Sequence, residues 1–318
     1  MDNALRELLT DDKSYYDYSI GPILLALALG LLARSHLVKF LPYTVWLLLG
    51  GMAIGVAYTS QPELLNQGLE RSVGDWINLD PTALFTVFLP VLIFVSAWSM
   101  HIHMLQRQIW QILWLAFPAV VVGTALTATF LKYVLYDWDW LPCLLLGTIV
   151  SSTDPVATVA LLKEQGVSDK LSTLIEGESL FNDGSALVLF ELFLGAIEGH
   201  ELTPGGVPIT FVRSSLGGAA LGFVLGYAAA QVLRLIVNDA VAEVTLTLVM
   251  CHSTWLLAQG TPIGVSGVMA VVLMGLTLRK QGRPFVSPSV QAFMTDFWIL
   301  LDFLANTVVF FVAGIILM

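Results

Sequence analysis

The chain has 318 residues, of which 57% are hydrophobic and only 12% are charged, and its formal net charge is −10. Soluble domains carry about 25% charged residues, and the mean hydropathy of this chain is +0.81. Because apolar runs of about 20 residues, long enough for a helix to cross the hydrocarbon layer, recur along it, the composition excludes a soluble globular protein. It predicts an all-α polytopic membrane protein.

The first predicted element is an acidic stretch, residues 1–19, which we interpret as an extramembrane N-terminus because it lacks the basic region and cleavage site of a signal peptide. Residues 20–318 form the predicted transmembrane domain. Its apolar runs and the breaks between them predict ten spans. They cover 20–34, 42–59, 80–100, 110–133, 140–163, 170–197, 208–237, 240–259, 263–281 and 291–318.

The basic residues of the connections predict the orientation. One side holds Arg34, Lys39, Arg107, Lys163, Lys170, Arg234, Arg279, Lys280 and Arg283, and the other holds Arg6, Lys13, Arg71, Lys132 and Arg213. Because Lys and Arg accumulate in cytoplasmic connections, the first side is predicted to be cytoplasmic and the N-terminus outside. His101 and His103 lie on the predicted cytoplasmic side and are candidates for sensing pH.

Several kinds of site are not expected. Cys143 and Cys251 are the two cysteines, and each lies inside an apolar run, so neither a disulfide framework nor a thiolate metal site is predicted. We find no phosphate-binding lysine loop and no basic stripe, so no nucleic-acid partner is expected. The expected surroundings are the lipid bilayer, and the function is expected to depend on polar groups inside it.

The fifth predicted span contains the sequence SSTDP at 151–155, which puts Asp154 directly before Pro155. Proline removes a backbone donor and disfavours helix at the preceding residue, so the span is predicted to break here. A break inside a bilayer exposes unpaired backbone groups, which are tolerated only where they line a cavity or a site. Transporters use such breaks to coordinate cations.

The sixth predicted span carries Glu178, Ser179, Asn182 and Asp183. Ser179 and Asp183 are four residues apart, so they share a helix face and their oxygens can reach one site. With carbonyl groups freed around Thr153, they supply the several oxygen ligands that a hard cation needs. We expect Asp183 to be buried and to bind either a proton or a cation, never both, which couples the two flows.

Each motif also has a purely structural interpretation. Asp154 can be a helix-terminus residue without a ligand role, and the Asn182-Asp183 pair can hold helices together through interhelical hydrogen bonds. Ionisable residues inside a membrane segment mark functional sites by default, and here two such motifs lie on consecutive spans. We therefore favour the functional interpretation of the two motifs taken together.

At these motifs, SSTDPVA at 151–157 and GESLFND at 177–183, the sequence resembles the monovalent cation/proton antiporters, the family of sodium/proton exchangers. Further similarity lies in FLP at 88–90 before Phe94, in SGVMA at 266–270 and in FLANT at 303–307. The resemblance extends from Ile20 to Met318. The stretch from Leu171 to Phe190 is particularly similar to the plant plasma-membrane salt-tolerance type and to the sperm type.

The resemblance implies a thirteen-helix inverted-repeat fold and a homodimer, in which a core domain moves like an elevator against a dimerisation domain. It implies a secondary active transporter, not an enzyme, without a cofactor and residing in the plasma membrane. It also implies that the chain is C-terminally truncated, so that its last three helices are missing and the transmembrane domain is incomplete.

The resemblance also assigns roles to site residues. It implies that Asp183 is the exchange carboxylate and that Na+ binds at Asp183, Ser179 and Thr153, with Asp154 beside them. Asn182 stands where electrogenic relatives carry a second aspartate, which implies electroneutral exchange of one Na+ for one H+. The resemblance implies four supporting residues, Asn182, Glu178, Pro155 and Asn306. In the family, Glu178 pairs with an arginine of the eleventh helix, which this chain is expected not to include. Asn306 matches the residue that plant and bacterial relatives carry at this position.

Other functions stay open on the sequence alone. Potassium/proton exchange is an alternative, with K+ or Li+ in place of Na+, because no spacing rule decides the selectivity. A truncated, non-transporting membrane subunit is another. An intramembrane aspartyl protease also uses two membrane aspartates, but its Tyr-Asp and Gly-x-Gly-Asp patterns are absent around Asp154 and Asp183.

Overall fold

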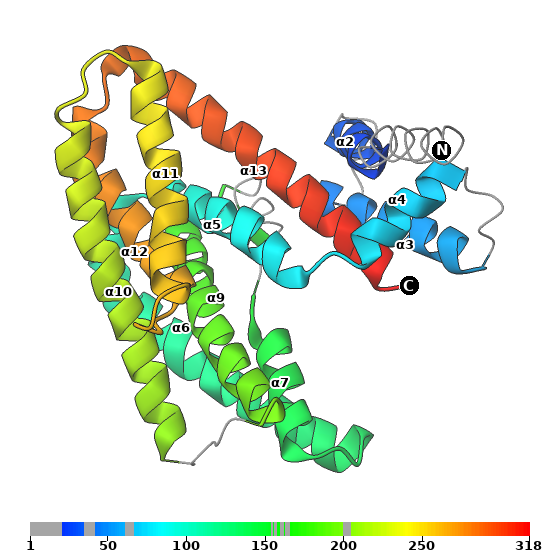
Figure 1. The fold of residues 1–318 in the computed structure, drawn as a ribbon. Helices are drawn as coiled ribbons and strands as arrows, with labels where there is room; N and C mark the ends of the chain where they lie inside the picture. The colour runs from blue at the N-terminus through cyan, green and yellow to red at the C-terminus, as the bar shows by residue number, and fades with distance from the viewer. Residues whose placement is uncertain are drawn as a thin grey trace, which may run out of the picture. The chain divides into compact units, whose positions relative to one another are not determined.

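The computed structural model describes residues 21–34, 42–60, 67–153, 155, 158–159, 162, 166–199 and 205–318, and every regular element within these ranges is a helix (Figure 1). The chain divides into two compact units. One consists of Met1–Leu92 with Ile299–Met318, and the other of Ile93–Trp298. The helices α5 (Pro81–Ser99) and α13 (Pro288–Ile316) run from one unit into the other.

The first unit contains α2 (Gly21–Arg34), α3 (Tyr43–Ser60), α4 (Gln67–Ile77) and the carboxyl-terminal part of α13. A core cluster of Ala26, Val73, Phe311 and Ile315 holds α2, α4 and α13 together. The helix α4 was not predicted, and it lies between the second and third predicted spans. It is amphipathic, with Val73 fully buried, and its charged residues hide the apolar face from a hydropathy average.

The second unit is a helical bundle. It contains α6 (Ile102–Phe130), the π-helical turn η2 (Leu131–Leu135), α7 (Trp140–Ser151), α9 (Asp169–Ile197), α10 (Gly206–Leu233), α11 (Ala240–Gln259), α12 (Gly267–Thr277) and the turns η3 (Leu278–Gly282) and η4 (Arg283–Phe285). In Figure 1, α6, α7 and α9 lie side by side, and α10 runs along α12 and α11. One face of α6 is buried in this packing, and its buried residues recur every three or four positions: Leu105, Gln108, Ile112, Ala116, Val120, Thr124 and Ala128.

Close packing of α10 against α12 depends on three glycines spaced by four residues. A Cβ atom on Gly218 would collide with the carbonyl oxygen of Ser266, and one on Gly222 with the carbonyl oxygen of Ala270. A Cβ on Gly226 would lie 2.7 Å from the carbonyl oxygen of Met274. Small residues at this spacing let two membrane helices approach backbone to backbone, so this stripe sets the distance between α10 and α12.

Seven of the described helical segments are long and apolar enough to cross a membrane, and two shorter apolar helices, Gly21–Arg34 and Trp140–Ser151, accompany them. The ten spans predicted from the sequence are all represented by helices, with changed bounds. The fourth begins at Ile102, not at residue 110, because its first turns carry polar residues that depress the hydropathy. In the fifth span the helix α7 ends at Ser151, and residues 158–159 and 162 are helical again; the ninth begins at Gly267.

Candidate functional site

The predicted break in the fifth span is present. The helix α7 ends at Ser151, and Ser152 has extended backbone angles, φ −72° and ψ 137°. Thr153 is not helical, and the carbonyl oxygen of Pro155 accepts a hydrogen bond from the amide of Val159 at 2.7 Å. The proline explains the interruption, because it lacks an amide donor and disfavours helix before it. Asp154 lies outside the described residues.

The middle of α9 lies against this break. The hydroxyl of Ser179 donates a short hydrogen bond to the carbonyl oxygen of Thr153. This contact satisfies a carbonyl group that the break removes from the helix, as buried backbone requires. The structure therefore brings together Thr153 and Ser179, as predicted, and the carbonyl group freed by the break is already engaged by the serine hydroxyl.

Asn182 connects the broken segment at the end of α7 with α9 through several contacts. Its Nδ2 atom lies 3.1 Å from Thr153 Oγ1, 3.3 Å from the carbonyl oxygen of Ser151 and 3.1 Å from Glu178 Oε1. The residue is 2% exposed, and its Oδ1 atom has no hydrogen-bond partner among the described residues. Because an amide offers two donors and two acceptor lone pairs, the side chain uses its nitrogen to tie the break to α9 and leaves its oxygen as a buried acceptor.

Asp183 lies one residue further along α9, and its Oδ1 atom accepts a hydrogen bond from the hydroxyl of Ser152 at 2.7 Å. The expectation that Asp183 is buried is wrong for this structure, in which its side chain is exposed. This contact connects the exposed carboxylate of α9 to the broken segment after α7. Sequence reasoning did not single out Ser152, although it lies within the motif that marked the break.

The remaining predicted residues have other surroundings. Glu178 is half-buried and accepts the hydrogen bond from Asn182 described above. Asn306 belongs to the other unit, where its Nδ2 atom donates to Asp302 Oδ1 at 3.1 Å. The structure thus joins Thr153, Glu178, Ser179, Asn182 and Asp183 into one polar cluster. Asn306 belongs to the other unit, so its position relative to this cluster is not described.

The chemistry of this cluster is that of oxygen ligands. A carboxylate (Asp183), two hydroxyl groups (Ser152 and Thr153) and the buried amide oxygen of Asn182 lie along the junction of a broken helix with α9. Discontinuous helices of this kind coordinate cations in transporters. Within the described ranges no three His, Cys, Asp or Glu side chains are grouped as a metal site would require.

Comparison with known proteins decides the family. The sequence profile described as "Sodium/hydrogen exchanger, transmembrane" matches residues 23–318. The chain belongs to the sodium/hydrogen exchanger family. The resemblance predicted from the two motifs is thereby confirmed, and membership makes the chain part of a multi-pass membrane protein of a transporter family.

Relatives in this family come from plants and bacteria. Sodium/hydrogen exchanger 7 of Arabidopsis thaliana is 38% identical over 297 residues, which are 92% of this chain and 26% of the plant protein. Sodium/hydrogen exchanger 8 of the same plant is 38% identical over 87% of this chain and 36% of its own length. The Na(+)/H(+) antiporter ApNhaP of Aphanothece halophytica is 32% identical over 92% of this chain and 53% of its own. The chain thus spans about a quarter to a half of these curated relatives.

A solved structure has the same fold. The sodium proton antiporter MjNhaP1 from Methanocaldococcus jannaschii matches with a TM-score of 0.76, covering 94% of this chain and 70% of its own, at 22% sequence identity. At this identity the match concerns the fold alone. The helical arrangement of this chain is therefore similar to that of MjNhaP1.

Proposed function

We propose that the chain is the membrane part of a sodium/proton antiporter in which Asp183 binds either a proton or Na+. The observation that carries this proposal is the hydrogen-bonded junction of the broken helix with α9, where Ser152 donates to Asp183 and the buried oxygen of Asn182 has no partner among the described residues. Family membership and relatives named as sodium/hydrogen exchangers support it.

The cation site in this proposal comprises Asp183, Thr153 and Asp154, with the Asn182 oxygen as an additional ligand. Ser179 positions Thr153 through its hydrogen bond to the Thr153 carbonyl. The carboxylate carries a negative charge that only one of the two ions neutralises at a time. Loading of Na+ therefore requires departure of the proton, and a single carboxylate exchanges one Na+ for one H+ without net charge movement.

The larger arrangement follows the family expectation. We propose a thirteen-helix inverted repeat in a homodimer, elevator-type movement of a core domain, a plasma-membrane location and an outside N-terminus. The broken α7 supports the inverted-repeat fold, because such interruptions lie at repeat interfaces in transporters. The basic residues of the connections support the orientation.

Proteoliposomes test the role of Asp183. Purified protein is reconstituted with a pH-sensitive dye inside, and an imposed sodium gradient drives proton movement. We expect Asp183→Asn to abolish the sodium-dependent pH change and Asp296→Asn, at an exposed aspartate of α13, to leave it intact. Normal exchange in Asp183→Asn would refute the proposal. Repeating the assay with potassium gradients, and with the membrane potential clamped at different values, tests ion selectivity and electroneutrality.

A further inference from the structure

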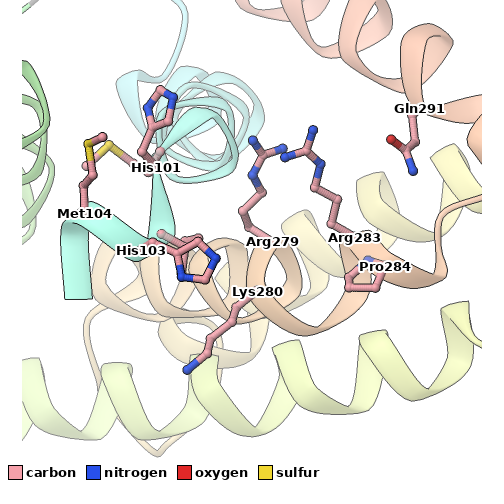
Figure 2. A pocket seen from close by; sticks show the side chains of 10 residues that line it. His101, His103, Met104, Arg279, Lys280, Arg283, Pro284 and Gln291 are labelled. Atoms are coloured by element: carbon pink, nitrogen blue, oxygen red, sulfur yellow. The ribbon is translucent and has the colours of Figure 1, made fainter. Parts of the chain in front are cut away.

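A separate pocket of about 570 Å³ lies within the unit Ile93–Trp298, and none of the residues of the candidate cation site lines it. Its wall comes from the start of α6 with the two residues before it, from η3 and η4 after α12, and from Gln291 of α13 (Figure 2). The lining residues include Arg279, Lys280 and Arg283, and none of them is acidic. The pocket therefore presents a concentration of positive charge that its own lining does not neutralise.

The two arginines are arranged as a pair. Figure 2 shows the guanidinium groups of Arg279 and Arg283 next to each other and pointing the same way, while Lys280 points away from them. Trp98 holds Arg279 in place, with the guanidinium carbon 5.5 Å from the ring centroid. Both guanidinium groups are charged at neutral pH. Two adjacent like charges repel each other, and an anion between them would remove that repulsion.

A helix terminus contributes to the same pocket. His101 is the N-cap residue of α6, its side chain makes no capping hydrogen bond, and the first turn contains no acidic residue. The 29-residue helix thus directs the positive end of its dipole toward a pocket already lined by arginines. Helix N-termini and arginine forks are two recurrent ways in which proteins bind phosphate, and here they converge.

Several contacts hold the connection between α12 and α13, which carries Arg279 and Arg283. Ser287 donates to the fully buried Glu243 from its amide, at 3.0 Å, and from its hydroxyl, at 2.6 Å. The amide of Asn238 donates to the same hydroxyl at 2.8 Å. Arg234 lies over the ring of Phe285, 5.8 Å from its centroid. These contacts fix η4 and its neighbours, so the pocket is preorganised, and the Glu243 carboxylate is engaged by Ser287.

We propose that this pocket binds a phosphate group, with Arg279 and Arg283 as the donors and the N-terminus of α6 as additional stabilisation. The volume exceeds that of inorganic phosphate and lies in the range of about 300–1,000 Å³ usual for small-molecule sites. Both connections in its wall lie on the predicted cytoplasmic side, where basic pockets between membrane helices accept anionic lipid headgroups. The phosphate group belongs either to such a lipid or to a soluble compound. The proposal of a phosphate site does not depend on the role of Asp183.

A binding assay on the purified chain in detergent tests the proposal. The probes are dioctanoyl phosphatidic acid, dioctanoyl phosphatidylcholine and inorganic phosphate, all at one ionic strength. We expect saturable binding of phosphatidic acid and none of phosphatidylcholine. Replacing both arginines, Arg279→Gln with Arg283→Gln, removes two charge-assisted contacts and is expected to weaken binding by about a hundredfold, about tenfold for each. Arg213→Gln, at an exposed arginine of α10, is the matched control and is expected to change nothing.

The outcomes separate the two sources of phosphate. Displacement of phosphatidic acid by millimolar inorganic phosphate indicates a site for a soluble phosphate group, and resistance to displacement indicates a lipid headgroup site. Equal binding of phosphatidylcholine overturns the proposal, and so does unchanged affinity in the double variant. If the double variant folds poorly, the two single substitutions provide the same comparison. Unchanged phosphatidic acid binding in both single variants would also overturn the proposal. Sodium-driven exchange is not the readout, so failure here is distinguishable from failure of the antiporter assignment.

Discussion

The hydroxyl of Ser152 donates a 2.7 Å hydrogen bond to the carboxylate of Asp183, across 31 residues of sequence. It links the extended backbone after α7 directly to the proposed exchange carboxylate on α9. A hydrogen bond to a charged group contributes about 1.5–3 kcal/mol. Movement of the broken segment would therefore change the stability of the charged form of Asp183, which is the form that binds Na+ in the proposed exchange.

Replacing Ser152 by alanine is expected to weaken cation binding. The variant removes one stabilising donor from the carboxylate, so the half-maximal sodium concentration should rise about tenfold, consistent with the energy of a charge-assisted contact. Sodium titration of the pH change in proteoliposomes at fixed pH measures this. Ser151→Ala is the control, because the Ser151 hydroxyl donates to Gly147 within its own helix. A similar sodium dependence in Ser152→Ala and wild type would contradict the role of this contact.

Asn182→Ala is expected to destabilise the protein. The substitution removes the amide nitrogen near Ser151, Thr153 and Glu178, and interhelical hydrogen bonds in membranes contribute about 0.6–1.7 kcal/mol each. A loss of about 1–3 kcal/mol should appear as a lower midpoint of thermal unfolding in detergent. Thr129→Ala is the control, because the exposed Thr129 hydroxyl bonds within its own helix. An unchanged midpoint would show that the amide does not hold the break against α9.

Gly222→Leu is expected to disrupt the packing of α10 against α12. Any Cβ at this position meets the backbone of Ala270, which cannot move aside as a side chain can. Overpacking costs typically about 1–3 kcal/mol and sometimes more, so the yield of monodisperse protein in size-exclusion chromatography should fall strongly. Gly205→Ala, at a position where a Cβ meets open space, should behave like wild type. Equal yields for the two variants would show that α10 and α12 do not depend on the glycine stripe.

Ser287→Ala is expected to lower stability through Glu243. The variant removes the shorter of the two hydrogen bonds that Ser287 donates to this fully buried carboxylate. Leaving a buried charged group short of a donor costs about 1–3 kcal/mol or more. Thermal unfolding again measures the loss, and Glu243→Gln combined with Ser287→Ala should recover part of it by removing the charge. Should the single variant melt like wild type, the contact would have no structural role.

Local features of the sequence predicted much of this protein. Hydropathy located the membrane helices because lipid requires long apolar segments whose backbone is internally bonded. Pro155 located the helix break because its effect on the backbone acts within one residue. The spacing of Ser179 and Asp183 placed both on one face of a helix, and the combination of motifs identified the exchanger family.

Only the tertiary structure decided which groups meet. Ser152 as the partner of Asp183, and Asn182 as the connection to Thr153, depend on the path of the chain after the break, which no local rule supplies. The arginine pocket joins residues near 101 to residues near 283, and the amphipathic α4 is stabilised by a core formed with α2 and α13. Periodicity and proline act locally, whereas hydrogen-bond partners and pockets arise from packing between distant segments. The sequence by itself therefore determined the membrane class, the family and the position of the carboxylate, and the fold decided what surrounds it.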